Sequence, residues 1–145
     1  MIRKLEIKDK ENWTKFYNRY TDFYKVPMNA EILDIVWTWI HDKKHVVNGI
    51  CLDLEDKNVG IAHYRTMPRP LKGQYMCFLD DLFVESAYRG QKIAQKLIGH
   101  LKSLSKANNW CGIRWITHSS NENAKKLYDR IAKNTGFDIY ELKND

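Results

Sequence analysis

The sequence predicts one α/β (α+β) domain, in which a mixed, mostly antiparallel sheet of about six strands is covered by four helices. The length of 145 residues suits a single domain that spans 1–145. Strand-like and helix-like patterns alternate along the chain, and a short turn joins two of the strands as an antiparallel hairpin. A strand–helix–strand unit over 75–117 requires one parallel pair with a right-handed crossover.

The first half of the chain is expected to hold two helices and three strands. Apolar residues recur at helical spacing after Asp9 and after Asn29, and both residue types favour helix N-caps. The second helix is expected to bury Trp39, with Trp37 on a different face. The expected elements are a strand over 2–7, a helix to about 23, a helix to about 41, and strands over 45–54 and 59–65 joined by a turn at 55–58.

The second half is also expected to hold two helices and three strands. The central strand over 75–84 is rich in aromatic and β-branched residues, and it follows a loop marked by Pro68, Pro70 and Gly73. The other expected elements are a helix that ends near 106, a strand over 111–117, a helix from 120 or 121 to about 132, and a last strand over 137–142.

The composition is that of a globular protein with a basic surface. The formal net charge of +6 favours anionic partners, but the lysines are scattered and do not form the block with interleaved aromatic residues that nucleic-acid binders carry. The three cysteines lie far apart and no histidines have ligand spacing, which predicts reduced thiols, a cytoplasmic location and no metal site. No apolar run suits a membrane span or a signal sequence.

The turn between the central strand and the following helix is a candidate phosphate site. Arg89, Gly90 and Lys92 stand at the start of this helix, where backbone N–H groups and the helix dipole attract anions. Gly90 also allows a ligand to approach the backbone closely. Because basic residues at helix starts are often only solvated surface, the flanking residues must decide between the two interpretations.

The run 84–94 resembles the acyl-CoA signature of the GNAT superfamily of N-acetyltransferases. That signature is Arg or Gln, two residues, Gly, one residue, and then Gly or Ala. Arg89 and Ala94 fit it, and Lys92 stands where the family usually has its central Gly.

A second GNAT-like signature follows further along the chain. Asn121 is followed seven residues later by Tyr128, and Thr135-Gly136-Phe137 then resembles the start of a Gly-aromatic strand. In addition, the run Leu-Asp-Asp-Leu-Phe-Val at 79–84 most resembles the branch that holds diamine, thialysine and related small-amine acetyltransferases. The resemblance is close over about 75–142 and extends to the N-terminal half only in outline.

The resemblance implies acetyl-CoA as a co-substrate and, for many members, a homodimer. It also implies that the end of the central strand pairs with pantetheine and that the following turn holds the pyrophosphate. The cofactor-binding residues expected on this basis are Leu82, Phe83, Val84, Arg89, Gly90, Gln91, Lys92, Ile93, Ala94 and Asn121.

Two adjacent carboxylates, Asp80 and Asp81, are the candidates for handling the acceptor amine. A free alkylamine has a pKa of about 10.4, so acetyl transfer needs a group that takes a proton. Because neighbours on a strand face opposite sides of the sheet, only one of the two is expected to face the acceptor pocket. The resemblance puts an acidic residue of the small-amine branch at Asp80, the candidate catalytic carboxylate, which either acts through water or simply attracts the cationic amine. Asp81 is the candidate substrate-binding residue, and ordinary ion pairs are the alternative for both.

Four aromatic residues complete the predicted site. Trp13, Tyr17 and Tyr24 belong to an aromatic stripe on the first helix, and they are expected either to line the acceptor pocket or to pack in the core. Tyr128 is the candidate general acid that protonates the leaving thiolate, a role that the resemblance implies. Core packing is the alternative for Tyr128 as well.

The expected function is therefore acetyl-CoA-dependent N-acetyl transfer to the primary amine of a small molecule, such as a polyamine, an amino acid or an analogue. The amine would attack directly in a ternary complex. Acetylation of a protein or peptide is one alternative, and a weakly catalytic CoA-binding module is another. A nucleic-acid binder is the third alternative.

Overall fold

The computed structural model describes residues 1–144. Within them, the chain forms five strands, four α-helices and three short 3-10 helices. The strands are β1 (Ile2–Lys4), β2 (Val47–Leu54), β3 (Lys57–Arg69), β4 (Gln74–Val84) and β5 (Ile113–Trp115). The helices are α1 (Lys10–Phe23), α2 (Ala30–His41), α3 (Ile93–Ala107) and α4 (Glu122–Ile131), and the 3-10 turns are η1 (Ile7–Asp9), η2 (Pro70–Lys72) and η3 (Ser86–Tyr88).

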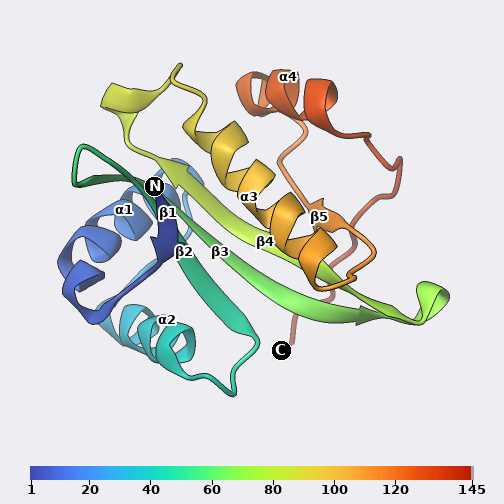
Figure 1. The fold of residues 1–145 in the computed structure, drawn as a ribbon, viewed down its shortest axis with the longest axis horizontal. Helices are drawn as coiled ribbons and strands as arrows, with labels where there is room; N and C mark the ends of the chain where they lie inside the picture. Colours follow the sequence, from blue (N-terminus) through green and yellow to red (C-terminus); the bar gives the residue numbers. More distant parts are fainter. Residues whose placement is uncertain (145) are drawn as a thin grey trace.

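The five strands form one sheet in the order β1-β2-β3-β4-β5. The first three junctions are antiparallel, and β4 and β5 are parallel, with α3 as the crossover between them. Helices α1 and α2 lie on one face of the sheet, and α3 lies on the other (Figure 1). The predicted mixed, mostly antiparallel sheet with four helices is confirmed.

Each face of the sheet has its own apolar core. On the α3 face, Leu97 and Leu101 are completely buried against strand residues such as Val59 and Ala62. On the α1–α2 face, Trp13 and Phe16 pack with residues of α2 and of the strands. Strand β4 contributes to both cores, and the residues of the candidate site lie along it.

The β2–β3 hairpin turns more tightly, and β3 runs further, than the sequence predicts. Glu55 and Asp56 both take positive φ values, so a two-residue turn joins the strands. Strand β3 then continues through Pro68, which the sequence places in a loop, and Pro68 lies opposite Tyr75 of β4. Proline is tolerated there because β2 ends opposite Arg65, so that the missing N–H faces no neighbouring strand.

The predicted last strand over 137–142 is absent, which reduces the sheet from about six strands to five. Its apolar residues are instead exposed, with Phe137 at 83% and Leu142 at 98% of their full accessibility. The alternation of apolar residues shows that a segment suits a pleated surface, but a strand also needs a neighbour to bond with. The first strand is also shorter than predicted and ends at Lys4, after which the chain enters η1.

Helix α2 begins as predicted but presents a different face. The Asn29 side chain caps it by accepting a hydrogen bond of 2.9 Å from the N–H of Ile32. Trp37 is the buried tryptophan, whereas Trp39 is 40% exposed and stacks on the ring of His45. The two tryptophans lie on different faces, and the predicted burial of Trp39 is wrong because only one of those faces meets the sheet.

Candidate acetyl-transfer site

A β-bulge in β4 organises the carboxylates of the site. Opposite β4, His63 pairs with Asp81 and the next residue of β3, Tyr64, pairs with Leu79. Asp80 is therefore the extra residue of the ladder, with no partner of its own on β3.

The bulge places both carboxylates on the face of the sheet that α1 covers. Leu79 packs in the core under α3, so the next side chain, that of Asp80, turns to the α1 face. The extra residue then interrupts the alternation, and Asp81 also faces α1, where it contacts Tyr17 and His63. The prediction that Asp80 and Asp81 face opposite sides is wrong, because it assumes regular alternation across the bulge.

Asp81 is the end of a buried hydrogen-bond chain that starts in α1. The indole Nε1–H of Trp13 donates to Nε2 of His63 at 2.8 Å, and Nδ1 of His63 lies 2.8 Å from Oδ2 of Asp81. The hydroxyl of Tyr17 donates to the same oxygen at 3.2 Å. His63 is 2% exposed and Trp13 is fully buried, so this chain is held inside the protein.

The geometry also assigns the tautomer of His63. An indole nitrogen is only a donor, so Nε2 of His63 must accept, and its proton sits on Nδ1 and is donated to Asp81. His63 thus acts as a neutral donor to the Asp81 carboxylate. Burial alone would raise the pKa of Asp81, but interactions with His63, Tyr20 and Tyr17 outweigh it and hold that pKa below its ordinary value.

Asp80 lies in a different environment. Both of its carboxylate oxygens lie 3.2 Å from Nε of Arg65 on β3. Burial raises the pKa of Asp80 above the ordinary value, and the charge of Arg65 offsets this only in part. Asp80 is therefore the more basic of the two carboxylates, which suits a group that takes a proton.

The edge of β4 beyond the bulge is open. Strand β5 pairs with Cys77, Phe78 and Leu79 only, so the backbone of β4 after Leu79 has no strand on that side within the described residues. The predicted cofactor-contacting run Leu82, Phe83 and Val84 lies on this open stretch. Phe83 is buried against Phe16 of α1, and its neighbours Leu82 and Val84 pack on the α3 side, so the side chains of this run are used in packing. Only the backbone of this run is available to a ligand.

The turn before α3 presents backbone donors at an exposed surface. Within α3 the N–H of Lys96 donates to the carbonyl of Lys92 at 2.9 Å, so the N–H groups of the first turn precede the hydrogen-bonded part of the helix. The side chains of the predicted residues Arg89, Gln91 and Lys92 are exposed, Ala94 is half-buried, and Ile93 is buried in the core. This arrangement of free donors and two cations fits a polyphosphate.

Lys92 and Gly90 both take left-handed backbone conformations in this turn. Lys92 has φ of 61° and ψ of 28° at the N-cap of α3, and Gly90 has φ of 88°. A residue with a Cβ atom is strained in that region, and glycine is not. The position where the GNAT signature usually has Gly is therefore one whose backbone favours Gly, and in this chain Lys92 adopts the same conformation.

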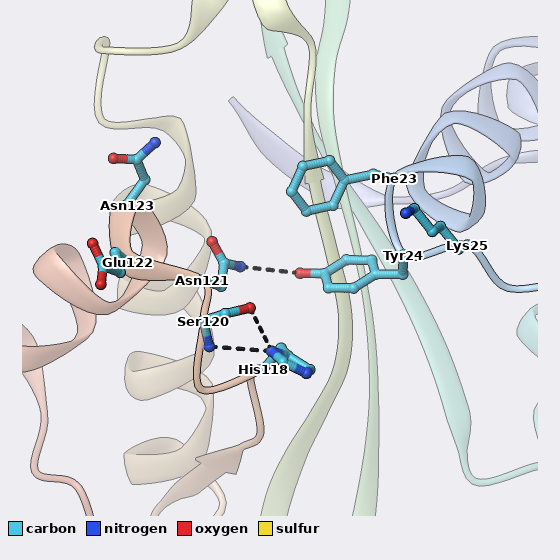
Figure 2. Close-up of a pocket in the computed structure, with 8 residues that line it drawn as sticks. All are labelled: Phe23, Tyr24, Lys25, His118, Ser120, Asn121, Glu122 and Asn123. Atoms are coloured by element: carbon cyan, nitrogen blue, oxygen red, sulfur yellow. Dashed lines mark hydrogen bonds between the residues drawn. The ribbon is translucent and has the colours of Figure 1, made fainter.

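A cavity of about 640 Å³ lies between the end of α1 and the start of α4. Figure 2 shows Tyr24 and Asn121 facing each other across it, with the Nδ2 of Asn121 donating to the Tyr24 hydroxyl at 3.4 Å. Asn121 also lies 3.4 Å from the hydroxyl of Thr117. Asn121 precedes α4 without capping it through its side chain, so its amide is directed to the cavity.

Tyr128 follows on α4 and packs edge-on against Trp115 of β5, with ring centroids 5.3 Å apart. No hydrogen bond to its hydroxyl is formed within the described residues. Burial, with a smaller contribution from Tyr24, raises the pKa of Tyr128, so the phenol keeps its proton at neutral pH. A protonated phenol without a partner can donate to an incoming group.

The structure thus brings most predicted site residues to the two sides of β4, with one exception among the aromatic residues. Tyr17 reaches Asp81 and Tyr24 lines the cavity, but Trp13 has no exposed surface and acts on the site only through His63. His63 itself is missing from the predicted site. A signal existed in the sequence, since a histidine among apolar strand residues is a polar group that requires buried partners.

Arg65 is the second residue that sequence reasoning missed. Arg65 stands two residues after His63 on the same strand, so the two side chains share one face of the sheet. This spacing could have indicated Arg65 as a site residue once His63 was recognised. Its ion pair with Asp80 depends on the bulge, which no sequence pattern signals.

No helix within the described residues is long and apolar enough to cross a membrane. Comparisons with known proteins agree with the fold described above. D-amino-acid N-acetyltransferase HPA3 of Saccharomyces cerevisiae is 24% identical to this chain over 143 residues, which are 97% of this chain and 89% of that protein.

Two solved structures illustrate the likeness in fold. A ribosomal-protein-alanine N-acetyltransferase from Brucella melitensis biovar Abortus 2308 superposes with a TM-score of 0.84 at 20% identity and covers 99% of each chain. AAC(6')-Iy, solved in complex with the bisubstrate analogue CoA-S-monomethyl-acetylneamine, has a TM-score of 0.85 at 15% identity and covers 100% of this chain and 98% of its own. The profile of the acetyltransferase (GNAT) family matches residues 13–132, and the chain therefore belongs to this family of acetyltransferases.

Proposed function

We propose that this protein transfers the acetyl group of acetyl-CoA to the primary amine of a small molecule by direct attack in a ternary complex. One observation carries the proposal: the open edge of β4 beyond Leu79 lies between a carboxylate pair and a phenol. Asp80 and Asp81 stand on the α1 side, and Tyr128 stands on the α4 side. An acyl transfer needs a base, an acid and a polarising donor around one carbonyl, and this edge offers all three.

Acetyl-CoA would supply an activated acetyl thioester. The exposed N–H groups at the start of α3, with Arg89 and Lys92 beside them, would hold its pyrophosphate. Backbone groups of Leu82, Phe83 and Val84 would bond to the pantetheine arm and polarise the carbonyl. The Asn121 amide, whose two hydrogen bonds are both 3.4 Å long, is available to the same arm.

The residues of the site account for both protons that the amine loses. Asp80 takes one proton from the substrate ammonium, and the neutral amine then forms the N–C bond as the C–S bond breaks. Tyr128 donates its proton to the leaving sulfur, and the second amine proton replaces it on the phenol. Asp81, fixed by His63 and Tyr17, attracts the ammonium and orients it.

A small acceptor is supported by the site and by the relatives. On the acceptor side, Tyr17 of α1 contacts Asp81 directly, so a compact amine can be held between α1 and the carboxylates. The names of the yeast relative and of AAC(6')-Iy, with its acetylneamine analogue, point to small molecules. Acetylation of a protein remains the alternative, for which the fold of the Brucella enzyme offers a precedent.

We also propose a homodimer in which the 137–142 segment of one copy pairs with β5 of the other. The segment is alternately apolar, and Phe137 and Leu142 are largely exposed. Strand β5 has β4 on one side and no strand on its other side within the described residues. If each copy placed its 137–142 segment beside β5 of the other copy, the free edge of each β5 would gain a neighbouring strand, and the dimer would have twofold symmetry. Light scattering should give a dimer for the wild type and a monomer for Leu142→Asp with Phe137→Asp, and a monomeric wild type would remove the proposal.

A cytoplasmic location is part of the same proposal. Cys51, Cys77 and Cys111 are all free in the structure, as expected of a reducing compartment.

The first experiment is thermal unfolding with acetyl-CoA, with desulfo-CoA and with a short nucleic acid. A ligand at about 100 times its dissociation constant adds about 2.7 kcal/mol, which is a shift of several degrees. Shifts with both CoA compounds, followed by amine-dependent release of CoA, would support the enzyme. A shift without release would favour the CoA-binding module. A shift with nucleic acid alone would remove the proposal.

A further inference from the structure

Arg65 presents an unused half of its guanidinium group beside the two carboxylates. Its Nε lies 3.2 Å from both oxygens of Asp80, and its guanidinium carbon lies 4.9 Å from the centre of the Phe78 ring. The side chain is 43% exposed. Arg65 is thus held at one end by an ion pair and an aromatic ring, while the other end faces solvent.

The two terminal nitrogens of Arg65 form no hydrogen bond or ion pair within residues 1–144. A guanidinium group has five N–H donors, and only the Nε–H is used here. The pair of terminal nitrogens presents a planar fork that matches a carboxylate. In a site for a small amine, an anionic group of the substrate would accept hydrogen bonds from these two nitrogens.

We infer that the acceptor is an α-amino acid whose carboxylate binds the terminal nitrogens of Arg65 while its amine lies at Asp80 and Asp81. This inference rests on the proposed function and narrows its substrate class. The Arg65–Asp80 contact puts a cation and a base side by side. A substrate that carries its amine and its carboxylate on one carbon reaches both at once.

The same contacts disfavour a polyamine. A diamine would bring a second ammonium group, and Asp81 can bind only the first. Asp80 already bonds to Arg65, and Arg65 itself repels a second cation. The charges that line the site therefore match a zwitterion better than a dication.

The test compares alanine and phenylalanine, each in its D and L forms, with the corresponding amides and with putrescine. The amide keeps the amine and the side chain but has no negative charge. For the wild type we expect kcat/KM for the better amino acid to exceed that for its amide and for putrescine by about 10-fold or more. The same order is expected in calorimetric binding to the protein saturated with desulfo-CoA.

The decisive variant is Arg65→Met, with Arg65→Lys and Arg69→Met as comparisons. Arg65→Met should raise KM for the amino acid at least 10-fold and change KM for the amide little. The change in kcat that follows from the lost contact with Asp80 should be the same for both substrates. Arg65→Lys should restore part of the preference because it keeps a cation, although it lacks the fork. Arg69 lies further along the same strand and makes no ion pair within the described residues, so Arg69→Met should keep the full preference.

The outcomes separate this inference from the proposed function. Equal losses for acid and amide in Arg65→Met would mean that Arg65 only supports Asp80, and the inference would fail. A wild type that prefers putrescine would overturn it and leave acetyl transfer intact. If no acceptor is turned over, calorimetry decides: binding that prefers the acid through Arg65 would keep the inference without the reaction, and indifferent binding would overturn it.

Discussion

The α1 side and the α4 side of β4 are organised in opposite ways. On the α1 side, hydrogen bonds of 2.8 Å link Trp13 to His63 and His63 to Asp81, and both Trp13 and His63 are buried. On the α4 side, Asn121 reaches Tyr24 only at 3.4 Å, and the Tyr128 hydroxyl has no partner among residues 1–144.

This difference shows which half of the site the protein completes by itself. A carboxylate that must hold an ammonium group needs a fixed position, and its hydrogen bonds are supplied from within the fold. A phenol that must protonate a leaving group needs a free donor, and its partner arrives with the ligand. Substitutions on either side of β4, and in the turn that joins the two sides, test this difference.

Asp80→Asn should have the largest effect. The amide cannot accept a proton, so kcat should fall by about 100- to 10,000-fold at neutral pH, the range for a lost general base. In the wild type, kcat should decline as the pH falls through the pKa of Asp80, which burial raises, so the decline begins at a higher pH than for an ordinary aspartate. Stopped-time assays of CoA release across pH measure both effects. A variant that keeps wild-type turnover and its acid limb would transfer the role of base away from Asp80.

Tyr128→Phe should have the next largest effect, on the other side of the site. Loss of the hydroxyl should lower kcat by about 100-fold, because the thiolate then leaves without a proton. Binding of acetyl-CoA should persist, since the ring still packs on Trp115. The matched control is Tyr75→Phe, which removes the same atom from an exposed tyrosine opposite Pro68, outside the proposed site and the proposed interface. Equal rates for both variants and the wild type would remove Tyr128 from the mechanism.

His63→Leu should act mainly on the free energy of unfolding, with a smaller effect on kcat. It leaves the buried N–H of Trp13 without an acceptor, which costs about 1–3 kcal/mol in the free energy of unfolding. Urea unfolding measures this cost, and the double variant with Trp13→Phe should lose less than the sum of the single losses, because the two residues share one bond.

The same variant has a pH signature. In the wild type the pKa of Asp81 is lower in the folded than in the unfolded state. The ionised Asp81 therefore stabilises the fold fully at pH values above its unfolded-state pKa, and this stabilisation is lost as the pH falls through its folded-state pKa. His63→Leu should reduce this contribution, so that stability depends less on pH in the acid range below the unfolded-state pKa of the aspartate. Unchanged acid unfolding would mean that His63 does not support the charge of Asp81.

Lys92→Gly should have the smallest effect and concerns the turn that joins the two sides. Relief of the left-handed conformation should raise the free energy of unfolding by about 1 kcal/mol or less. Affinity for acetyl-CoA should fall several-fold because a cation is lost at the helix start. Lys92→Ala removes the charge but keeps the strain, so it should show the same affinity loss without the gain in stability. Tighter binding by the glycine variant would show instead that the lysine side chain crowds the ligand.

The elements of the fold could be predicted from the sequence because most of them carry local signals. Asn29 caps α2 as its residue type indicates, and the parallel β4–β5 pair follows from the strand–helix–strand order. The strand predicted over 137–142 failed for a non-local reason, since its formation depends on an available edge elsewhere. The exposure of Trp39 likewise depends on which face of α2 meets the sheet.

The site was predictable only where it lies in a contiguous motif. The turn from Arg89 to Ala94 and the pair Asn121 and Tyr128 are read from neighbouring residues. The partners of the carboxylates come from distant strands and helices, so His63 and Arg65 became apparent only once β3 and β4 were paired. The shared orientation of Asp80 and Asp81 could not be foreseen, because it depends on one unpaired residue.

That unpaired residue is dispensable to the sheet. Tyr64 and His63 are consecutive on β3, and they already pair with Leu79 and Asp81, so the ladder would close without Asp80. Deletion of this single residue would leave the packing of both cores in phase and would remove one charge from the acceptor side. Gain or loss of one codon, with no change to any other side chain, would therefore add or remove the proposed base while the fold around it stays the same.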